Sequence, residues 1–454
     1  MARYDLVVVG GGAAGFSAAT VAAEKGARVA LVSKGPLGGT CVNYGCVPTK
    51  YMLTALSRAK VSGLKVSLSQ VIGEAARVSE KLRRERYEDL LESLDVDFIR
   101  GSARFKEKGV LEVNGRHVEY DKAVIAVGAR TVRPRIPGVE ELGSKGLDNE
   151  SIMGLDRDPE RVVVVGGRAQ GVEFSQIMAR SGVEVLLLQR SPSLLPTEEP
   201  EVGATIKGIL QDDGVKVVTG VRLLAFKSGN GGVSVRYETG SGPREARADL
   251  VFFATGRRPV LEGLGLERVG VEVRGGFIVV DRHLKAAPGI YAAGDCIGEP
   301  MLEPVAAKEG YVAALNAIEG DTRVMDYTVV PRAVFTDPEF ARVGYTEREF
   351  ASKTGYCACR IAPLTVVPRA EIVAERRGFA KIVVDPKTHA IVGVHLVAPH
   401  ASEAIHEAVW LVKKRVTLEE LIDTVHVFPT MAESIKYAAL SFFRDVRKMP
   451  CCLL

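Results

Sequence analysis

The sequence predicts an α/β fold in which two three-layer domains precede a C-terminal α+β domain. Residues 4–20 (YDLVVVGGGAAGFSAAT) run from apolar residues into glycines and then into small helix formers. This is the pattern of a buried parallel strand that leads into a helix. The same pattern returns at residues 161–174 (RVVVVGGRAQGVEF), and from about Val330 alternating strands give way to amphipathic helices. Two such openings, far apart in the chain, indicate two separate α/β domains ahead of a third domain.

Length and composition agree with this organisation and exclude several functions. A chain of 454 residues exceeds a single core, and its hydrophobic share of 46% is ordinary for a globular protein. The net charge of +4 is small and no basic run accompanies it, so we expect no nucleic-acid partner. No segment has the length of a transmembrane helix, and the apolar start lacks a basic leader. We therefore expect a cytoplasmic protein with no membrane partner.

The first glycine-rich turn has the spacing of a Rossmann-like dinucleotide site. Gly10, Gly12 and Gly15 form GxGxxG directly after a strand, where glycines permit a tight turn and close approach of a pyrophosphate to the helix N-terminus. The next strand ends at Ser33, where such sites usually have an acid that holds the adenosine ribose. A serine hydroxyl still forms hydrogen bonds, so we expect weaker or rearranged ribose binding at a retained site.

The segment GGTCVNYGCVPTK at residues 38–50 carries the strongest chemical signal. Cys41 and Cys46 lie at the predicted start of a helix, where backbone N–H groups lower a thiol pKa. Lys50 falls one helical turn beyond Cys46 and adds positive charge. A structural disulfide or a metal-ligand pair is the alternative, but zinc sites have tighter spacing and a second ligand pair. The pattern therefore favours a redox-active pair.

This segment resembles the active-site disulfide of the FAD-dependent pyridine nucleotide–disulfide oxidoreductase family. The resemblance covers nearly the whole chain, because ATGRRP at residues 254–259, with Gly256, and GIYAAGDC at residues 289–296 match later motifs. It implies FAD binding at the first glycine turn and at Thr40, and a hydrogen bond from Asp295 to the flavin ribitol. It also implies a homodimer. The implied domains are an FAD-binding part at 1–148, an NAD(P)-binding domain at 149–276, a second FAD-binding or central part at 277–328, and a dimerisation domain with a Cys-Cys tail at 329–454.

The resemblance also implies roles for the residues around the cysteines. Cys46 would be the thiolate beside the flavin, and Cys41 would be the thiol that exchanges with substrate. Lys50 would form an ion pair with Glu173 near the flavin N5 atom. These roles come from the family likeness and not from the spacing of the residues.

The second glycine-rich turn is degenerate and favours NADPH. Gly166 and Gly171 match the first and last glycines, whereas Arg168 replaces the middle one. The following strand ends in Gln189 and Arg190 instead of an acid. An acid would bind the ribose 2′-hydroxyl of NADH and repel a 2′-phosphate, which Arg190 would attract. The alternative is that Arg190 only faces solvent.

The C-terminal region departs from the disulfide reductases of this family. Their His-Pro-Thr run places a proton-shuttling histidine beside a glutamate five residues on. Here the run is Phe428-Pro429-Thr430, and Glu433 has no histidine partner in that position. His426 is either a displaced substitute or a structural residue, and we favour the structural interpretation.

The sequence ends in RKMPCCLL, so Cys451 and Cys452 are adjacent at the terminus. Vicinal thiols form a strained disulfide and suit a soft, thiophilic ion as a dithiol. This tail resembles that of the mercuric reductase subfamily, in which the partner subunit's tail delivers Hg(II). Tyr87, within a charged helix predicted over residues 79–94, matches an active-site tyrosine of that subfamily, whereas Phe428 replaces a second one. A C-a-a-X prenylation box and a tail without function are the alternatives.

Together these motifs predict a cytoplasmic homodimer that uses FAD and NADPH to reduce Hg(II) from thiol complexes. Cys41 and Cys46 would hold the substrate ion after Cys451 and Cys452 of the other subunit deliver it. The first alternative is a dihydrolipoamide or other disulfide reductase that uses His426. The second is a flavoprotein that sequesters metal or senses redox state without catalysis.

Overall fold

The first domain is built on a twisted sheet with parallel central strands. The structure is a computed structural model that describes residues 3–450, so Cys451 and Cys452 lie outside the described residues. In spatial order the sheet contains β19 (Lys285–Ala287), β20 (Ile290–Ala292), β6 (Arg116–Ile125), β1 (Arg3–Val9), β2 (Val29–Ser33) and β3 (Asp97–Arg100), and the hairpin of β4 (Ala103–Glu107) and β5 (Val110–Val113) pairs with β6. Two distant parts of the chain therefore share this sheet.

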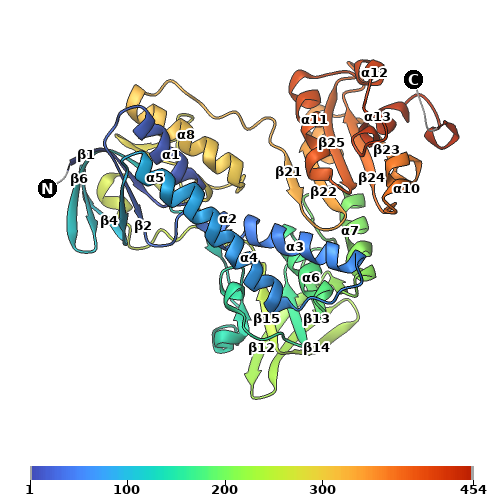
Figure 1. Ribbon diagram of the computed structural model, residues 1–454, viewed down its shortest axis with the longest axis horizontal. Coiled ribbons are helices and arrows are strands. Elements are labelled where there is room, and N and C mark those ends of the chain that lie inside the picture. The colour runs from blue at the N-terminus through green and yellow to red at the C-terminus, as the bar shows by residue number, and fades with distance from the viewer. Residues whose placement is uncertain (1–2, 451–454) are drawn as a thin grey trace.

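Two helices cover one face of this sheet (Figure 1). α1 (Ala13–Glu24) packs on α8 (Glu303–Glu319), and both present alanines to the contact. A Cβ atom added at Gly310 would lie 1.9 Å from the backbone oxygen of Ala14, so the helices meet backbone to backbone. This close packing holds the start of α1, just after the first glycine turn, against the middle of α8.

A pair of helices leads from the first domain to the second. α3 (Cys46–Val61) follows the short α2 (Gly39–Tyr44) and lies beside α4 (Leu68–Arg83), as Figure 1 shows. The π-helix η1 (Arg84–Glu88) and α5 (Asp89–Ser93) continue α4. A capping box starts α4, because Ser67 accepts a hydrogen bond from the Gln70 N–H.

The second domain has a parallel sheet with the order β11-β10-β9-β15-β8. Its strands are β8 (Gly146–Leu147), β9 (Arg161–Val165), β10 (Glu184–Gln189), β11 (Lys216–Thr219) and β15 (Leu250–Phe253). Its helices are α6 (Ala169–Arg180) and α7 (Pro200–Asp212). An antiparallel sheet covers the parallel one and consists of β12 (Arg222–Gly229), β13 (Gly232–Thr239) and β14 (Gly242–Ala248). One short pair joins the first and second domains: β7 (Arg130–Thr131) with β16 (Arg257–Arg258). The hairpin of β17 (Val273–Arg274) and β18 (Phe277–Ile278) follows, and Ile278 packs in the core of the first sheet.

The C-terminal domain has an antiparallel sheet with helices, as predicted. The strands, in spatial order, are β21 (Arg332–Val334), β22 (Glu339–Gly344), β25 (Ile391–Ala398), β24 (Phe379–Val384) and β23 (Ala358–Pro363), and the helices are α9 (Glu347–Thr354), α10 (Pro368–Ile372), α11 (Ala401–Lys414), α12 (Leu418–Asp423) and α13 (Glu433–Leu440). The predicted fold class of two Rossmann-like domains and a C-terminal α+β domain is confirmed. Within residues 3–450 no helix is both long and apolar enough to cross a membrane.

Candidate active site

The two cysteines of residues 38–50 meet where one helix ends and the next begins. Cys41 lies on α2, Gly45 breaks the helical path with φ −135° and ψ −111°, and Cys46 is the first residue of α3. Both are free thiols. A hydrogen bond from Cys41 lowers the pKa of Cys46, and the charge of Lys50 lowers it further, although burial opposes both. The same hydrogen bond, together with burial, raises the pKa of Cys41. The pair is therefore arranged as one thiol and one thiolate, with the thiolate on Cys46.

Lys50 and Glu173 form the ion pair that the resemblance implied. Lys50 Nζ lies 2.8 Å from Glu173 Oε2, and Glu173 is only 4% exposed. The other carboxylate oxygen of Glu173 accepts the backbone N–H of Phe335 at 2.9 Å, and Lys50 Nζ lies 4.6 Å from the centre of the Phe335 ring. The three residues come from three domains. Their contacts hold the Lys50 ammonium group in place one helical turn beyond Cys46.

Tyr87 and Glu303 add to the surroundings of the cysteines. Burial raises the pKa of Tyr87 to about 12, and the charges of Cys41 and Glu303 contribute. Tyr87 lies in the π-helix η1, and its ring centre is 4.5 Å from that of Phe16. Glu303, the first residue of α8, raises the pKa of both cysteines, and burial raises its own pKa. The sequence analysis missed Glu303. Its only signal is its place at a helix start shortly after the GDC motif.

The first glycine turn fits a bound FAD pyrophosphate. A Cβ atom at Gly10 would lie 2.1 Å from the Ala126 oxygen, and one at Gly15 would lie 1.7 Å from the Gly10 oxygen, so both positions require glycine for packing. At Gly12, by contrast, the nearest atom would be 3.9 Å away. Gly12 is the N-cap of α1 and no side chain caps that helix. The turn thus offers an open backbone at a helix N-terminus, as a pyrophosphate needs.

Other predicted FAD contacts cluster around Arg257. Its Nη2 atom donates to Thr40 Oγ1 at 3.2 Å, and its Nε atom lies 3.4 Å from Asp295 Oδ2. Burial raises the pKa of Asp295, and Arg257 counteracts this effect. Ser33 ends β2 and donates to the Gly35 oxygen at 3.1 Å, which leaves its lone pairs free to accept a ribose hydroxyl. Arg257 is therefore an organising residue that the sequence analysis named only as part of ATGRRP.

Gly256, in the same motif, has φ +101° and no atom within 4 Å of an added Cβ. Its backbone oxygen accepts the Val132 N–H at 2.9 Å, which ties the end of the second sheet to the segment after β7. The requirement for glycine at this position is conformational, because the left-handed region strains other residues.

The second glycine turn repeats the packing of the first. Cβ atoms at Gly166 and Gly171 would lie 2.3 Å from the Ala254 oxygen and 1.8 Å from the Gly166 oxygen. Arg168, at the middle position, is the exposed N-cap of α6. Its side chain therefore faces outward and does not fill the turn.

Gln189 and Arg190 have different surroundings at the end of β10. Gln189 is buried; its Oε1 atom accepts the Gly167 N–H at 3.0 Å and its Nε2 atom donates to the Ser193 oxygen at 3.3 Å. Arg190 is exposed and has no hydrogen-bond or ion-pair partner within residues 3–450. Gln189 thus shapes the loop, and Arg190 is the residue of the two that is free to contact a 2′-phosphate.

The structure does not bring His426 together with Glu433. His426 Nε2 lies 2.8 Å from Glu407 Oε1 on α11, and its Nδ1 lies 3.0 Å from the Thr424 oxygen. Glu433 Oε2 accepts the Thr430 N–H at the start of α13. Phe428 is 46% exposed. Each residue of the displaced pair therefore has a structural partner of its own.

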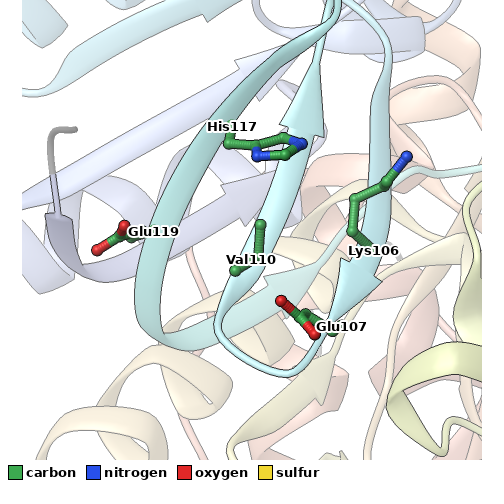
Figure 2. Close-up of a pocket in the computed structure, with 5 residues that line it drawn as sticks. All are labelled: Lys106, Glu107, Val110, His117 and Glu119. Atoms are coloured by element: carbon green, nitrogen blue, oxygen red, sulfur yellow. The ribbon is translucent and has the colours of Figure 1, made fainter.

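A separate pocket lies on the outer strands of the first sheet (Figure 2). Its lining residues are Lys106, Glu107, Val110, His117 and Glu119. Lys106 and His117 both face Glu112, at 3.0 Å and 4.0 Å. None of the predicted site residues lines this pocket, so it does not belong to the cysteine site.

Comparison with known proteins agrees with this geometry. The model of the pyridine nucleotide-disulphide oxidoreductase family matches residues 4–310, and that of its dimerisation domain matches residues 330–439. The chain belongs to this family. As a member of the pyridine nucleotide-disulphide oxidoreductases it is a FAD-dependent NAD(P)H disulfide oxidoreductase, and its dimerisation domain implies a homodimer.

Relatives within the family differ in what their names say they act on. The chain is 37% identical to a mercuric reductase of Staphylococcus aureus, over 99% of this chain and 84% of the relative. It is 36% identical to a dihydrolipoyl dehydrogenase of Thermus scotoductus, over 97% of each. The HOCl-induced flavoprotein disulfide reductase RclA of Escherichia coli has a similar structure, with a TM-score of 0.89, 28% identity, and coverage of 97% of this chain and 100% of that one. These likenesses establish the flavoprotein disulfide reductase class.

Proposed function

We propose that this enzyme uses NADPH to reduce Hg(II) to Hg(0) at the Cys41–Cys46 pair. The observation that carries the proposal is the environment of the C-terminal segment. Phe428 stands where the disulfide reductases have a proton carrier, His426 is bonded to Glu407, and Glu433 contacts only the Thr430 backbone among the hydrogen bonds of residues 3–450. The site is therefore equipped for a substrate whose reduction needs no delivered proton.

The proton balance separates the two kinds of substrate. Reduction of a disulfide takes two electrons and two protons and yields two thiols. Reduction of Hg(II) held between Cys41 and Cys46 takes two electrons, breaks two S–Hg bonds and yields Hg(0) and two thiolates. No proton enters this second reaction. A site with a phenylalanine at the proton-carrier position is compatible with it.

The residues around the cysteines would hold the negative charge that this reaction produces. FAD held at the first glycine turn, Thr40 and Asp295 would supply two electrons from NADPH to the Hg(II) that Cys41 and Cys46 hold. Lys50, fixed by Glu173, stabilises the Cys46 thiolate, and Cys41 keeps its proton until an incoming Hg(II)–thiol complex exchanges with it. Tyr87 places a phenolic hydroxyl near both thiols. The mercuric reductases among the relatives, at 35–37% identity, support the proposal.

The tail would deliver the ion, and Arg190 would select the cofactor. Cys451 and Cys452 lie outside the described residues, and their proposed role as the dithiol that passes Hg(II) across the dimer rests on the sequence. Arg190, exposed and unpaired within residues 3–450, would contact the 2′-phosphate of NADPH.

One observation favours a second candidate, reduction of a small disulfide such as lipoamide. His426 and Glu407 form a histidine–carboxylate pair at 2.8 Å, and Glu407 raises the pKa of His426. A raised pKa keeps a larger share of His426 protonated at neutral pH, so His426 would have a proton to give to a departing thiolate. The dihydrolipoyl dehydrogenase relative supports this candidate as well.

Parallel substrate assays distinguish the candidates. We expect NADPH oxidation with Hg(II) in excess thiol to exceed that with lipoamide or glutathione disulfide, and to be unchanged in His426→Gln. His389→Gln is the matched control, because His389 pairs with Glu419 at 2.6 Å in the same domain. Faster turnover with lipoamide that is lost only in His426→Gln would establish the second candidate instead.

A further inference from the structure

A buried lysine organises the contact between the second and C-terminal domains. Lys381, on β24, is 1% exposed, and its Nζ atom lies 2.9 Å from Glu199, 3.1 Å from Glu201 and 3.1 Å from Glu347. Glu199 and Glu201 stand at the start of α7, which lies beside the C-terminal domain in Figure 1. Glu347, the first residue of α9, is the third carboxylate of this cluster.

Two cysteines face the same carboxylate. Cys359 Sγ donates to Glu347 Oε2 at 3.1 Å, which is the atom that Lys381 also contacts. Cys357 lies in the same charged environment, because burial and the charge of Glu347 raise its pKa and the charge of Lys381 lowers it. Cys359 lies on β23, paired with Val383 of β24, and Cys357 precedes the strand. Residues two apart on an extended segment point to one face, so the Cys357 thiol lies on the same side of the segment as the Cys359 thiol, which contacts Glu347. Both are partly exposed.

We propose that Cys357 and Cys359 form a second dithiol site, which binds a soft ion that prefers two sulfur ligands, such as Hg(II). Thiolates select soft metals over hard ones. Within residues 3–450 no three or more His, Cys, Asp or Glu side chains are arranged to hold an ion. A zinc site needs four ligands, whereas Hg(II) is satisfied by two sulfurs in a line. The two-thiol arrangement therefore fits Hg(II) and not zinc.

The binding step is a thiol exchange without electron transfer. Burial raises the pKa of Cys357 and raises that of Cys359 to about 12, so both thiols are protonated at neutral pH. Two S–H bonds and two S–Hg bonds of an incoming Hg(II)–dithiol complex break. Two new S–Hg bonds form on Cys357 and Cys359, and the two protons leave on the released thiols. Glu347, held by Lys381, is placed to accept the Cys359 proton in transit.

This site is distinct from the redox pair. The charged neighbours of Cys357 and Cys359 are Glu347, Lys381 and Glu199, whereas those of the redox pair are Lys50, Glu173 and Glu303. The remaining described cysteine, Cys296, is fully buried and donates to the Ile125 and Ala293 oxygens. Cys296 therefore provides a matched control for a thiol that an ion cannot reach.

Retention of Hg(II) in the FAD-loaded, full-length protein tests the site without NADPH, so the result does not depend on the proposed function. In a background that carries Cys41→Ser, Cys46→Ser, Cys451→Ala and Cys452→Ala, we expect about one Hg per chain after gel filtration in excess monothiol. Adding Cys357→Ser and Cys359→Ser should abolish retention, and adding Cys296→Ser should leave it unchanged. Metal content is read by elemental mass spectrometry, and FAD absorbance verifies that each variant is folded.

Two results would overturn the proposal. One is a background variant that retains no Hg(II). The other is equal retention with and without Cys357 and Cys359, which would place the ion elsewhere. As a second check that does not require the double variant, Cys359→Ser alone should lower retention at least tenfold in excess monothiol, because a single thiol competes without chelation. Unchanged retention in this variant also contradicts the proposal.

Discussion

Cys46 is the thiolate of the redox pair because its neighbours all favour the same charge. It accepts a hydrogen bond from Cys41, it begins α3 where backbone N–H groups face it, and Lys50 lies one turn away. Burial opposes these effects without reversing them. The sequence predicted this arrangement because the three residues are local to one segment. It could not predict Glu303 or Arg257, which reach the site only through tertiary structure.

The lowered pKa of Cys46 predicts the behaviour of the thiolate–flavin charge-transfer band. Two-electron reduction should produce the band, Cys46→Ser should abolish it, and Cys41→Ser should show it without reduction. The thiolate exists above its pKa, so the band should persist below pH 9 and disappear as the pH falls through the lowered pKa. Lys50→Met should move this loss to higher pH, and Lys25→Met, a surface control paired with Glu319, should not. A band that survives in Cys46→Ser would reverse the assignment of the two thiols. Absorbance against pH provides the measurement.

His395 predicts an acid-sensitive fold. It is fully buried, its Nε2 atom bonds to the Tyr345 oxygen at 3.0 Å, and burial lowers its pKa to about 4. In the unfolded chain His395 is protonated below about pH 6.5, whereas in the folded chain it stays neutral down to about pH 4. The free energy of unfolding therefore falls as the pH drops from 6.5 to 4, by up to about 3 kcal/mol. His395→Gln should show a shallower loss of melting temperature from pH 6.5 to pH 4, and His389→Gln should match the wild type. If the melting temperatures of all three proteins fall equally between pH 6.5 and pH 4, His395 does not titrate as described.

At the scale of elements, the sequence identified the strand–glycine–helix units but not a π-turn inside one helix. Residues 79–94 were expected to form one charged helix and are helical as far as Ser93, but α4 ends at Arg83 and a π-helix follows at Arg84–Glu88 before α5. A π-helix has no strong sequence signal, and π-turns occur often at functional sites. Here the turn carries Tyr87 toward the cysteines. The sequence could not predict the role of Gln189 either, because its hydrogen bond to Gly167 forms only in the folded loop.

The loop after β10 predicts cofactor preference. Arg190→Ala should weaken NADPH binding by tenfold or more, since a charge-assisted contact contributes about 1.5–3 kcal/mol, and should leave NADH binding unchanged. Arg244→Ala is the control and should leave both affinities unchanged, because Arg244 is an exposed arginine of the same domain that lies on β14, outside the glycine turn and the loop after β10. Dissociation constants from flavin-quenching titrations provide the measurement. Equal affinities for the two nucleotides that do not change in Arg190→Ala would rule out this role.

At the scale of the whole molecule, ion pairs with buried members connect the domains to one another. Lys50–Glu173 joins the first two domains, and Lys381 joins the second to the third. Arg180 is 4% exposed and contacts both Asp213 and Asp337, at 2.9 Å and 2.8 Å. The apolar patterns of the sequence could predict the domains. They could not predict these junctions, because each joins charged residues that are far apart in the chain.

The dimer and the tail predict complementation between defective subunits. Cys451→Ala with Cys452→Ala should leave FAD binding, dimerisation and reduction of Cys41–Cys46 intact. Hg(II) turnover in excess thiol should fall steeply, because the inner pair alone must then compete with solution thiols for the ion. Mixed dimers with a Cys41→Ser, Cys46→Ser chain should recover part of the activity. Wild-type turnover of the tail variant at every thiol concentration would leave prenylation as the next explanation for the CCLL sequence.

The measurement that tests the mercury assignment most directly is the ratio of Hg(0) released to NADPH oxidised. Purified holoenzyme is given Hg(II) in excess thiol without oxygen, Hg(0) is trapped from the gas stream, and NADPH is followed by absorbance. A mercury reductase releases one Hg(0) for each NADPH consumed, and a Cys41→Ser, Cys46→Ser enzyme releases none. Tight binding of Hg(II) with no Hg(0) and no NADPH oxidation would contradict the assignment and indicate a flavoprotein that sequesters metal.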